Sequence, residues 1–259
     1  MKFVRIQTDK GIQHGVVQDG SVCIISGDIF SDWQYTGELV PLDTQKLLAP
    51  LKPESILCIG RNYKEHALEC GNDLPKKPVL FIKANSSLSG PEEPVHIPQE
   101  HTSQVDYEAE LAVIIGKAAK NVPVEEAMDY VFGYTCANDV SARDCQYENG
   151  QWARGKSFDN FCPLGPWIET EIDPLDLEIT GKRNGEVVQH SRTSLMIFPI
   201  PYLISYLSQT MTLLPGTVLL TGTPSGVVLG VKDDPQWLRA GETFEVEIEG
   251  IGSLKTRFS

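Results

Sequence analysis

The stretch VDYEAELAVII, residues 105–115, places three carboxylates at alternate positions immediately before an apolar run. Alternate side chains of a strand point to one face, so Asp106, Glu108 and Glu110 are predicted to project together. Two ionised carboxylates about 4 Å apart repel by about 4 kcal/mol at an effective dielectric near 20. Such crowding requires a protonated carboxyl, a bound cation, or exposure to water. An edge strand with a solvated acidic face would give the same pattern.

Composition excludes some classes of function. The 259 residues carry a net charge of −13 without a basic cluster, which argues against nucleic-acid binding. Apolar runs are shorter than the roughly 18 residues of a membrane span, so no membrane association is expected. The six cysteines form no Cys-x-x-Cys pair, and the N-terminal MKFVRIQTDKG has no apolar targeting core. These features predict free thiols in a soluble, cytoplasmic protein.

The order of β-prone segments predicts a mainly β, α+β fold with short helices. Residues 1–50 are predicted to form a small N-terminal β domain, and the two prolines of 47–53 indicate a linker to a larger domain at 51–259. The strands expected are 3–6, 15–17, 22–25, 56–59, 79–82, 111–115, 131–137, 167–169, 178–183, 218–221 and 244–248. The helices expected are 62–70, 124–130, 141–148 and 199–209.

A fourth carboxylate follows the strand predicted at 131–137. Asp139 stands where that strand gives way to a helix near Ser141. Aspartate is common there as a helix N-cap. The alternative is a metal ligand, which would complete an all-oxygen set with Glu108 and Glu110. Such a set suits Mg²⁺ or Mn²⁺, with Ca²⁺ as a substitute, better than zinc.

The segment GRNYKEHALECG, residues 60–71, contains the short helix predicted at 62–70. Asn62 and Glu65 resemble a capping box, and Gly71 is a suitable stop. His66 and Glu69 are three residues apart and share a helix face. A carboxylate beside an imidazole orients it as a general base, although an ordinary surface pair has the same spacing. The helix could belong to a lid over a ligand.

Two lysines and one turn are further candidates. Lys83 ends an apolar run and could point into a cleft or extend to solvent, and Lys156 in GKSFD presents the same choice. The turn TGTPSG, residues 221–226, offers backbone donors and hydroxyls at close approach. It matches neither a phosphate-binding loop nor a serine nucleophile elbow.

Together these segments resemble the fumarylacetoacetate hydrolase family. The resemblance runs in order along about 53–255, and one departure follows the TGTPSG turn, where Val227–Val228–Leu229–Gly230 replaces the usual continuation. The segments that carry it are GRNY with His66 and Glu69, DYEAE at 106–110, NDVSARD at 138–144, GKSFD at 155–159, TGTPSG at 221–226 and VEIEGIG at 246–252.

The resemblance implies a mixed β-roll or sandwich, a homodimer, and roles for individual residues. The implied metal ligands for Mg²⁺ or Mn²⁺ are Glu108, Glu110 and Asp139, with Asp106 in support. The implied catalytic residues are His66, Glu69 and Lys156. The substrate-binding candidates are Arg61, Tyr63, Lys83, Arg143, Gln146 and Thr223.

The resemblance also implies a reaction. The protein would be a metal-dependent hydrolase that cleaves a C–C bond of a small 2-oxo acid or 1,3-dicarbonyl, such as an acylpyruvate or fumarylacetoacetate. The reaction would pass through a metal-bound enolate, and His66 with Glu69 would activate the attacking water. Alternatives within the same site are oxaloacetate decarboxylation or tautomerisation, and isomerisation of 2-hydroxyhepta-2,4-diene-1,7-dioate. A non-catalytic metal-binding scaffold is a distant alternative.

Overall fold

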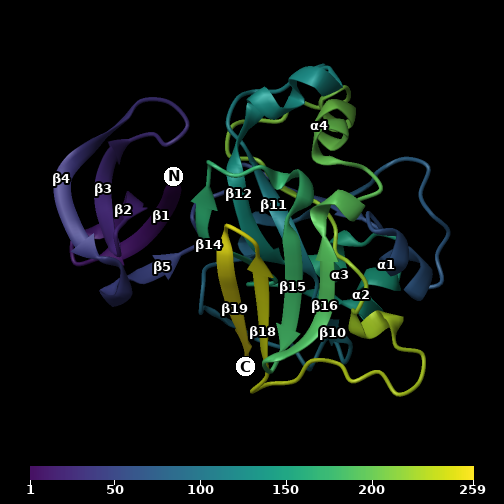
Figure 1. Ribbon diagram of the computed structural model, residues 1–259. Helices are drawn as coiled ribbons and strands as arrows, with labels where there is room; N and C mark the ends of the chain where they lie inside the picture. The colour runs from purple at the N-terminus through teal and green to yellow at the C-terminus, as the bar shows by residue number, and fades with distance from the viewer.

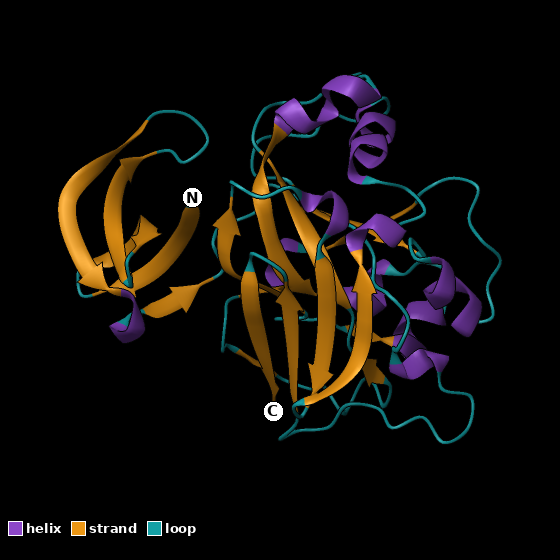
Figure 2. Ribbon diagram, viewed as in Figure 1, coloured by secondary structure: helices purple, strands orange, loops and turns teal.

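The computed structural model describes residues 1–259 and shows a mainly β protein with short helices, as predicted (Figures 1 and 2). The strands of the first half are β1 (Lys2–Thr8), β2 (Gly11–Gln18), β3 (Ser21–Gly27), β4 (Trp33–Pro41), β5 (Lys46–Leu48), β6 (Ile56–Gly60), β7 (Val79–Lys83), β8 (Leu88–Ser89), β9 (Pro94–Val95), β10 (Val105–Asp106) and β11 (Ala109–Ile115). Those of the second half are β12 (Val131–Asn138), β13 (Ser141–Ala142), β14 (Cys162–Glu169), β15 (Glu178–Arg183), β16 (Glu186–Arg192), β17 (Val218–Leu220), β18 (Thr243–Ile248) and β19 (Gly252–Phe258). The α-helices are α1 (Lys64–Glu69), α2 (Arg143–Tyr147), α3 (Ala153–Lys156) and α4 (Ile200–Ser208).

Two sheets enclose the main core. The larger runs in the order β4-β3-β2-β1-β14-β12-β11-β17-β6-β7, and the smaller in the order β16-β15-β18-β19-β9. The largest hydrophobic cluster contains side chains of β11 and β12 from the first sheet and of β15, β18 and β19 from the second. Figure 1 shows β15, β16, β18 and β19 in front of β11 and β12. This packing holds the central strands β11 and β12 rigidly at the ends that carry Glu110 and Asn138.

The N-terminal strands continue the larger sheet. Lys2 and Phe3 of β1 pair antiparallel with Glu169 and Ile168 of β14, and β1–β5 form the group at the left of Figure 1. A small separate core of valines and isoleucines lies within β1 and β3. The division at residue 50 stays a prediction, because hydrogen-bonded strands run across it.

The solvated edge considered for residues 105–115 is wrong. Strand β11 pairs with β12 on one side and β17 on the other, and each of its residues is buried. The prediction that one strand carries all three carboxylates is wrong as well, because the strand is interrupted at Tyr107 and Glu108. Asp106 lies on the separate strand β10, which pairs with β13. Asp106 is accordingly not part of the carboxylate cluster, which Glu108 and Glu110 form with Asp139.

The capping box predicted at Asn62 is absent. Helix α1 starts at Lys64 without a side-chain cap. The Asn62 amide instead donates to the carbonyls of Phe198 and Thr221, and its oxygen accepts the Phe198 N–H. Gly71 follows the helix with φ +71°, as a C-terminal stop requires. Asn62 therefore fastens the start of α1 to the TGTPSG turn.

Other differences concern polar segments. Residues 124–130 form a 3₁₀-helix instead of an α-helix, and α2 begins at Arg143, so Asp139 caps no helix. Strands β4, β16 and β19 were not predicted, because their exposed faces carry many polar side chains and little apolar alternation.

No helix is long and apolar enough to cross a membrane. The homodimer and the cytoplasmic location stay predictions.

Candidate active site

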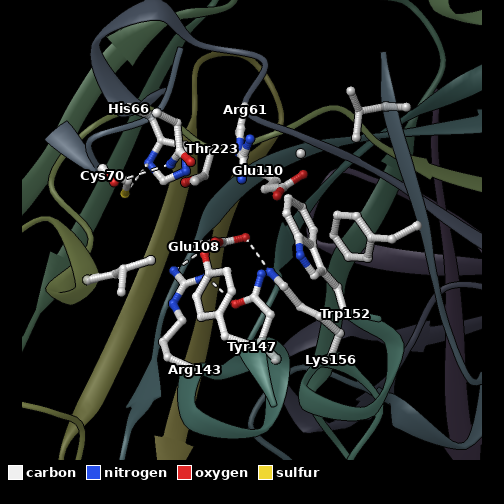
Figure 3. Close-up of a pocket in the computed structure, with 16 residues that line it drawn as sticks. Arg61, His66, Cys70, Glu108, Glu110, Arg143, Tyr147, Trp152, Lys156 and Thr223 are labelled. Carbon is white, nitrogen blue, oxygen red and sulfur yellow. Dashed lines mark hydrogen bonds and ion pairs between the residues drawn. The ribbon is translucent and has the colours of Figure 1, made fainter. Parts of the chain in front are cut away.

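One pocket collects most of the predicted functional residues. Its wall is formed by β6, α1, β11, α2, α3 and the turn after β17, and includes Arg61, His66, Glu108, Glu110, Arg143, Gln146, Lys156 and Thr223 (Figure 3). The cavity among them measures about 20 Å³, room for about one water molecule.

Three buried carboxylates meet at this pocket, and two of them, Glu108 and Glu110, line it. Oxygens of Glu108, Glu110 and Asp139 lie within 4.8 Å of one another, and all three side chains are buried. Asp139 stands at the end of β12, next to the start of β11, because Ala109 pairs with Asn138. The antiparallel register of two neighbouring strands thus creates the cluster that the sequence predicted.

Lysines bind two of the three carboxylates. The Lys156 ammonium donates to Glu108 Oε2 at 2.7 Å and to Asp139 Oδ2 at 2.8 Å. Lys83 donates to Asp139 Oδ1 at 2.6 Å and does not line the pocket. Burial alone would lower the pKa of Lys156, but the Asp139 and Glu108 charges raise it above its usual value. Lys156 is therefore a fixed cation at neutral pH.

Glu110 has no cationic partner. Its Oε2 accepts only the Gly222 N–H, at 2.7 Å. Burial, together with the charges of Asp139 and Glu108, raises the pKa of Glu110 well above its usual range. Burial would also raise the pKa of Glu108, but Lys156 and Arg143 lower it below its usual value. Within the acidic cluster, the negative charge of an ionised Glu110 is therefore not neutralised by any cationic side chain.

This donor set fits a divalent cation. Three carboxylates without sulfur or imidazole ligands are the chemistry that Mg²⁺ and Mn²⁺ prefer. A cation held by Glu108, Glu110 and Asp139 would compensate the charge of the Glu110 carboxylate. The acidic cluster can thus hold a metal, while the sequence and fold leave its identity open.

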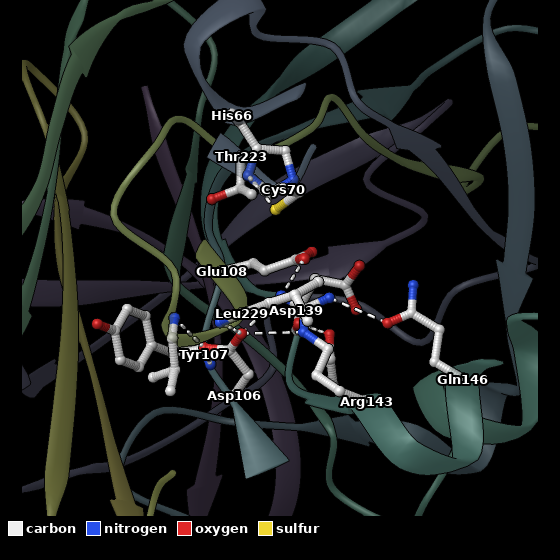
Figure 4. Close-up of polar contacts among 12 residues, drawn as sticks. His66, Cys70, Asp106, Tyr107, Glu108, Asp139, Arg143, Gln146, Thr223 and Leu229 are labelled. Carbon is white, nitrogen blue, oxygen red and sulfur yellow. Dashed lines mark hydrogen bonds and ion pairs between the residues drawn. The ribbon is translucent and has the colours of Figure 1, made fainter. Parts of the chain in front are cut away.

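Asp106 and Arg143 form the layer beneath (Figure 4). Arg143 Nε donates to Asp106 Oδ2 at 2.9 Å, and its Nη2 lies 2.8 Å from both Asp106 and Glu108. Asp106 also accepts the N–H groups of Val228 and Leu229. The segment that departs from the family pattern therefore anchors Asp106, and Leu229 contributes to the pocket wall.

The predicted dyad forms on α1. His66 Nδ1 lies 3.0 Å from Glu69 Oε1, and Glu69 Oε2 accepts the Gly226 N–H at 2.9 Å. His66 is buried at the pocket while Glu69 is part-buried behind it. Since Nδ1 faces the carboxylate, Nε2 is the nitrogen available to a ligand.

Arg61 differs from the other cations of the pocket in forming no ion pair. Its guanidinium stacks over the Trp152 ring at 5.4 Å, and Figure 3 shows it directed into the space above Glu110. Its φ of +58° lies in the left-handed region, which a non-glycine residue adopts at some energetic cost. The backbone thus holds an uncompensated cation at the pocket.

The other substrate-binding candidates lie in different settings. Gln146 lines the pocket and accepts from Arg143 at 3.0 Å. Thr223 also lines it, but its hydroxyl donates to the Ala109 carbonyl and accepts from Gln189. Tyr63 lies outside this pocket with a buried hydroxyl that has no partner.

Several lining residues were missed. Cys70, Asn72, Tyr147 and Trp152 belong to the wall, and only their place within or beside the predicted motifs could have indicated this. Gly60 also lines the pocket, and a Cβ there would lie 2.4 Å from the Trp152 ring. Burial, followed by the Glu69 charge, raises the pKa of the Cys70 thiol to about 12.

Replacing Asp106 tests the layer beneath the pocket. Asp106→Asn leaves the buried Arg143 with one carboxylate fewer, and we expect a loss of about 3 kcal/mol in the free energy of unfolding, measured with urea. Asp144→Asn is the matched control, because Asp144 accepts from Thr102, Ser103 and Cys145 but pairs with no cation. Its expected loss is about 1 kcal/mol. Equal losses would contradict the role given to the Arg143 pair.

Comparison with known proteins identifies the family of the chain. Residues 55–259 match the family described as fumarylacetoacetate (FAA) hydrolase, C-terminal, and residues 1–50 match Rv2993c-like, N-terminal. Protein Rv2993c of Mycobacterium tuberculosis is 47% identical over 223 residues, covering 85% of this chain and 81% of its own. Oxaloacetate tautomerase fahd2, mitochondrial, of Xenopus laevis is 50% identical, covering 80% of this chain and 66% of its own.

Solved structures extend the likeness to the whole chain. The 2-hydroxyhepta-2,4-diene-1,7-dioate isomerase from Mycobacterium marinum has a TM-score of 0.90 at 39% identity, covering 100% of this chain and 98% of its own. A fumarylacetoacetate hydrolase from Exiguobacterium antarcticum has a TM-score of 0.91 at 37% identity, with 100% and 99% covered. Homologues of this chain therefore include enzymes. The chain belongs to the fumarylacetoacetate hydrolase family.

Proposed function

We propose that this protein is an enzyme that moves a proton at the carbon beside the keto group of a 2-oxo dicarboxylic acid. Keto–enol tautomerisation of oxaloacetate is the simplest such reaction. The observation that carries the proposal is the position of the His66–Glu69 dyad at the same pocket as the acidic cluster and Lys156. The oxaloacetate tautomerases among the relatives support it.

His66 would act as the base. Glu69 accepts the Nδ1 proton, which leaves the Nε2 lone pair to remove a proton from the substrate carbon and raises its basicity. Gly226 and the helix fix Glu69 from behind. The same Nε2 returns the proton to carbon in the reverse direction, while the enolate oxygen takes up and releases its proton to water.

Lys156 would stabilise the negative charge that develops on the keto oxygen. Its ammonium is buried and already oriented by Glu108 and Asp139, and a preorganised donor of this kind lowers the barrier to an enolate. A Mg²⁺ or Mn²⁺ ion held by Glu108, Glu110 and Asp139 would supply Lewis-acid polarisation of the same oxygen.

Arg61 favours a dicarboxylate over a substrate with an apolar tail. Arg143 is occupied by Asp106 and Glu108, whereas Arg61 has no carboxylate partner. A guanidinium binds a carboxylate through two parallel N–H donors. The distal carboxylate of the substrate would provide the missing partner.

Hydrolysis of an acylpyruvate-like C–C bond, the reaction first expected from the sequence, is the second candidate. The dyad favours it, because the same Nε2 could deprotonate a water directed at the distal carbonyl. Decarboxylation of oxaloacetate and isomerisation of a hydroxy-dienedioate would use the same enolate-stabilising groups. Comparing product formation from oxaloacetate, acetylpyruvate and a dienedioate distinguishes these reactions.

Substitution of the base tests the proposal directly. His66→Gln keeps a polar side chain but removes the proton acceptor, and we expect the enzymatic rate of oxaloacetate tautomerisation to fall at least about 100-fold. The rate is followed by the ultraviolet absorbance of the enol, after subtraction of the uncatalysed rate. His190→Gln is the control, since His190 forms an exposed pair with Glu178 outside this pocket. Undiminished activity of His66→Gln would exclude the proposed base.

Substitution of Arg61 tests the substrate class. Arg61→Gln removes a charged contact of about 2 kcal/mol, so we expect kcat/KM for oxaloacetate to fall about 30-fold. Activity on acetylpyruvate, which lacks a distal carboxylate, should change little. Arg154→Gln serves as the control, because Arg154 is exposed and pairs with Glu148. An equal loss on both substrates would remove Arg61 as the receptor of the distal carboxylate.

Metal dependence is tested at Glu110. EDTA should abolish activity, and either Mg²⁺ or Mn²⁺ should restore it. Glu110→Gln should weaken Mn²⁺ binding, measured by calorimetry, at least about 100-fold, because even partners outside a metal's ligand set change affinity 10- to 100-fold. Glu169→Gln is a control at another buried glutamate, one that pairs with the N-terminus. Full activity in EDTA would overturn the cofactor assignment.

A further inference from the structure

We infer that the chain carries a second metal site, formed by His66, Glu69 and Cys70, which takes a soft divalent transition metal such as Zn²⁺. It lies on α1 at the wall of the same pocket, apart from the acidic cluster (Figure 4). Binding there rests on the geometry alone. Its consequence for catalysis rests on the function proposed above.

The ligand atoms already lie near tetrahedral spacing. His66 Nδ1 is 3.0 Å from Glu69 Oε1 and 3.9 Å from Cys70 Sγ, and the three ligand atoms lie within 4.8 Å of one another. Zinc bonds of about 2.3 Å to sulfur and about 2.0–2.2 Å to nitrogen and oxygen place such atoms about 3.4–3.6 Å apart. Small side-chain rotations therefore suffice to accommodate the ion.

The chain positions these ligands before any metal arrives. Residues at i, i+3 and i+4 share one face of a helix, and Cys70 is the residue that ends α1. The Gly226 N–H holds Glu69 Oε2, which leaves Oε1 directed at the imidazole. Both His66 and Cys70 line the pocket, so an ion can reach them from the cavity, and a water would complete the four ligands of a zinc site.

Ligand chemistry separates the two sites. Sulfur and imidazole select Zn²⁺, Cd²⁺ or Co²⁺ over Mg²⁺, whereas the all-carboxylate cluster suits Mg²⁺ or Mn²⁺. Binding releases the thiol proton of Cys70 and shifts the His66 ring proton from Nδ1 to Nε2, since cysteine coordinates as a thiolate and histidine as the neutral imidazole. The imidazole then carries its proton on Nε2 and loses Glu69 as its partner. A dyad in this state has no free base, so Zn²⁺ is an inhibitor.

Cadmium and cobalt report the site without an activity measurement. We expect one equivalent of Cd²⁺ or Co²⁺, added to Mg²⁺-saturated protein, to produce the ultraviolet charge-transfer absorbance of a thiolate–metal bond. Cys70→Ser should remove this band. Cys23→Ser is the matched control, because Cys23 is another part-buried thiol, on β3, and it should leave the band unchanged. A band of full intensity in Cys70→Ser would overturn the site.

Two further readouts complete the test. In the wild-type protein, Zn²⁺ should protect Cys70 from iodoacetamide, measured by peptide mass spectrometry, so the result does not depend on how a variant folds. Alkylation of Cys70 at the same rate with and without Zn²⁺ would overturn the site. The Zn²⁺ concentration for half-inhibition should rise at least about 10-fold in Cys70→Ser. Unchanged inhibition of Cys70→Ser would assign the Zn²⁺ effect to the acidic cluster and overturn the inhibitory role of the second site. If no activity exists to inhibit, the band and the protection still decide the site.

Discussion

The buried contact of Lys156 with Glu108 and Asp139 is the interaction on which the rest of the site depends. It joins α3 to the ends of β11 and β12. Burying an ammonium and two carboxylates costs several kcal/mol per ion, and only close, well-formed contacts offset that cost. The two sheets therefore have to hold these strand ends rigidly. Asn62, which links three segments through its amide, extends the same rigidity to α1.

Charge explains why this cluster is suited to binding a ligand. Four buried carboxyl groups face three buried cations: Asp106, Glu108, Glu110 and Asp139 against Lys83, Arg143 and Lys156. The carboxyl left over is Glu110, whose raised pKa reflects burial beside Asp139 and Glu108. A divalent cation would turn this excess of negative charge into an excess of positive charge. That reversal would prepare the pocket for an anionic substrate, with Arg61 adding a further cation at the pocket wall.

The sequence predicted the members of the site better than their arrangement. Glu108, Glu110 and Asp139 were grouped correctly through the family resemblance, whereas the residue pattern alone left a solvated edge and a helix cap open. The interruption at Tyr107 was not predictable, since it follows from the pairing of β10 with β13, a contact between distant segments. Asn62 was assigned to the wrong partner for the same reason. Local spacing favoured a helix cap, whereas its amide bonds to residues 136 and 159 positions away.

The segment Val227–Gly230, which departs from the family pattern after the TGTPSG turn, contacts several parts of the site. Val228 and Leu229 direct their N–H groups at Asp106, which orients Arg143, and Arg143 in turn contacts Glu108. Gly226, two residues before Val228, holds Glu69 behind His66. One short segment thus supports both the acidic cluster and the base across from it. A backbone shift there would change the contacts of Asp106 and of Glu69 together.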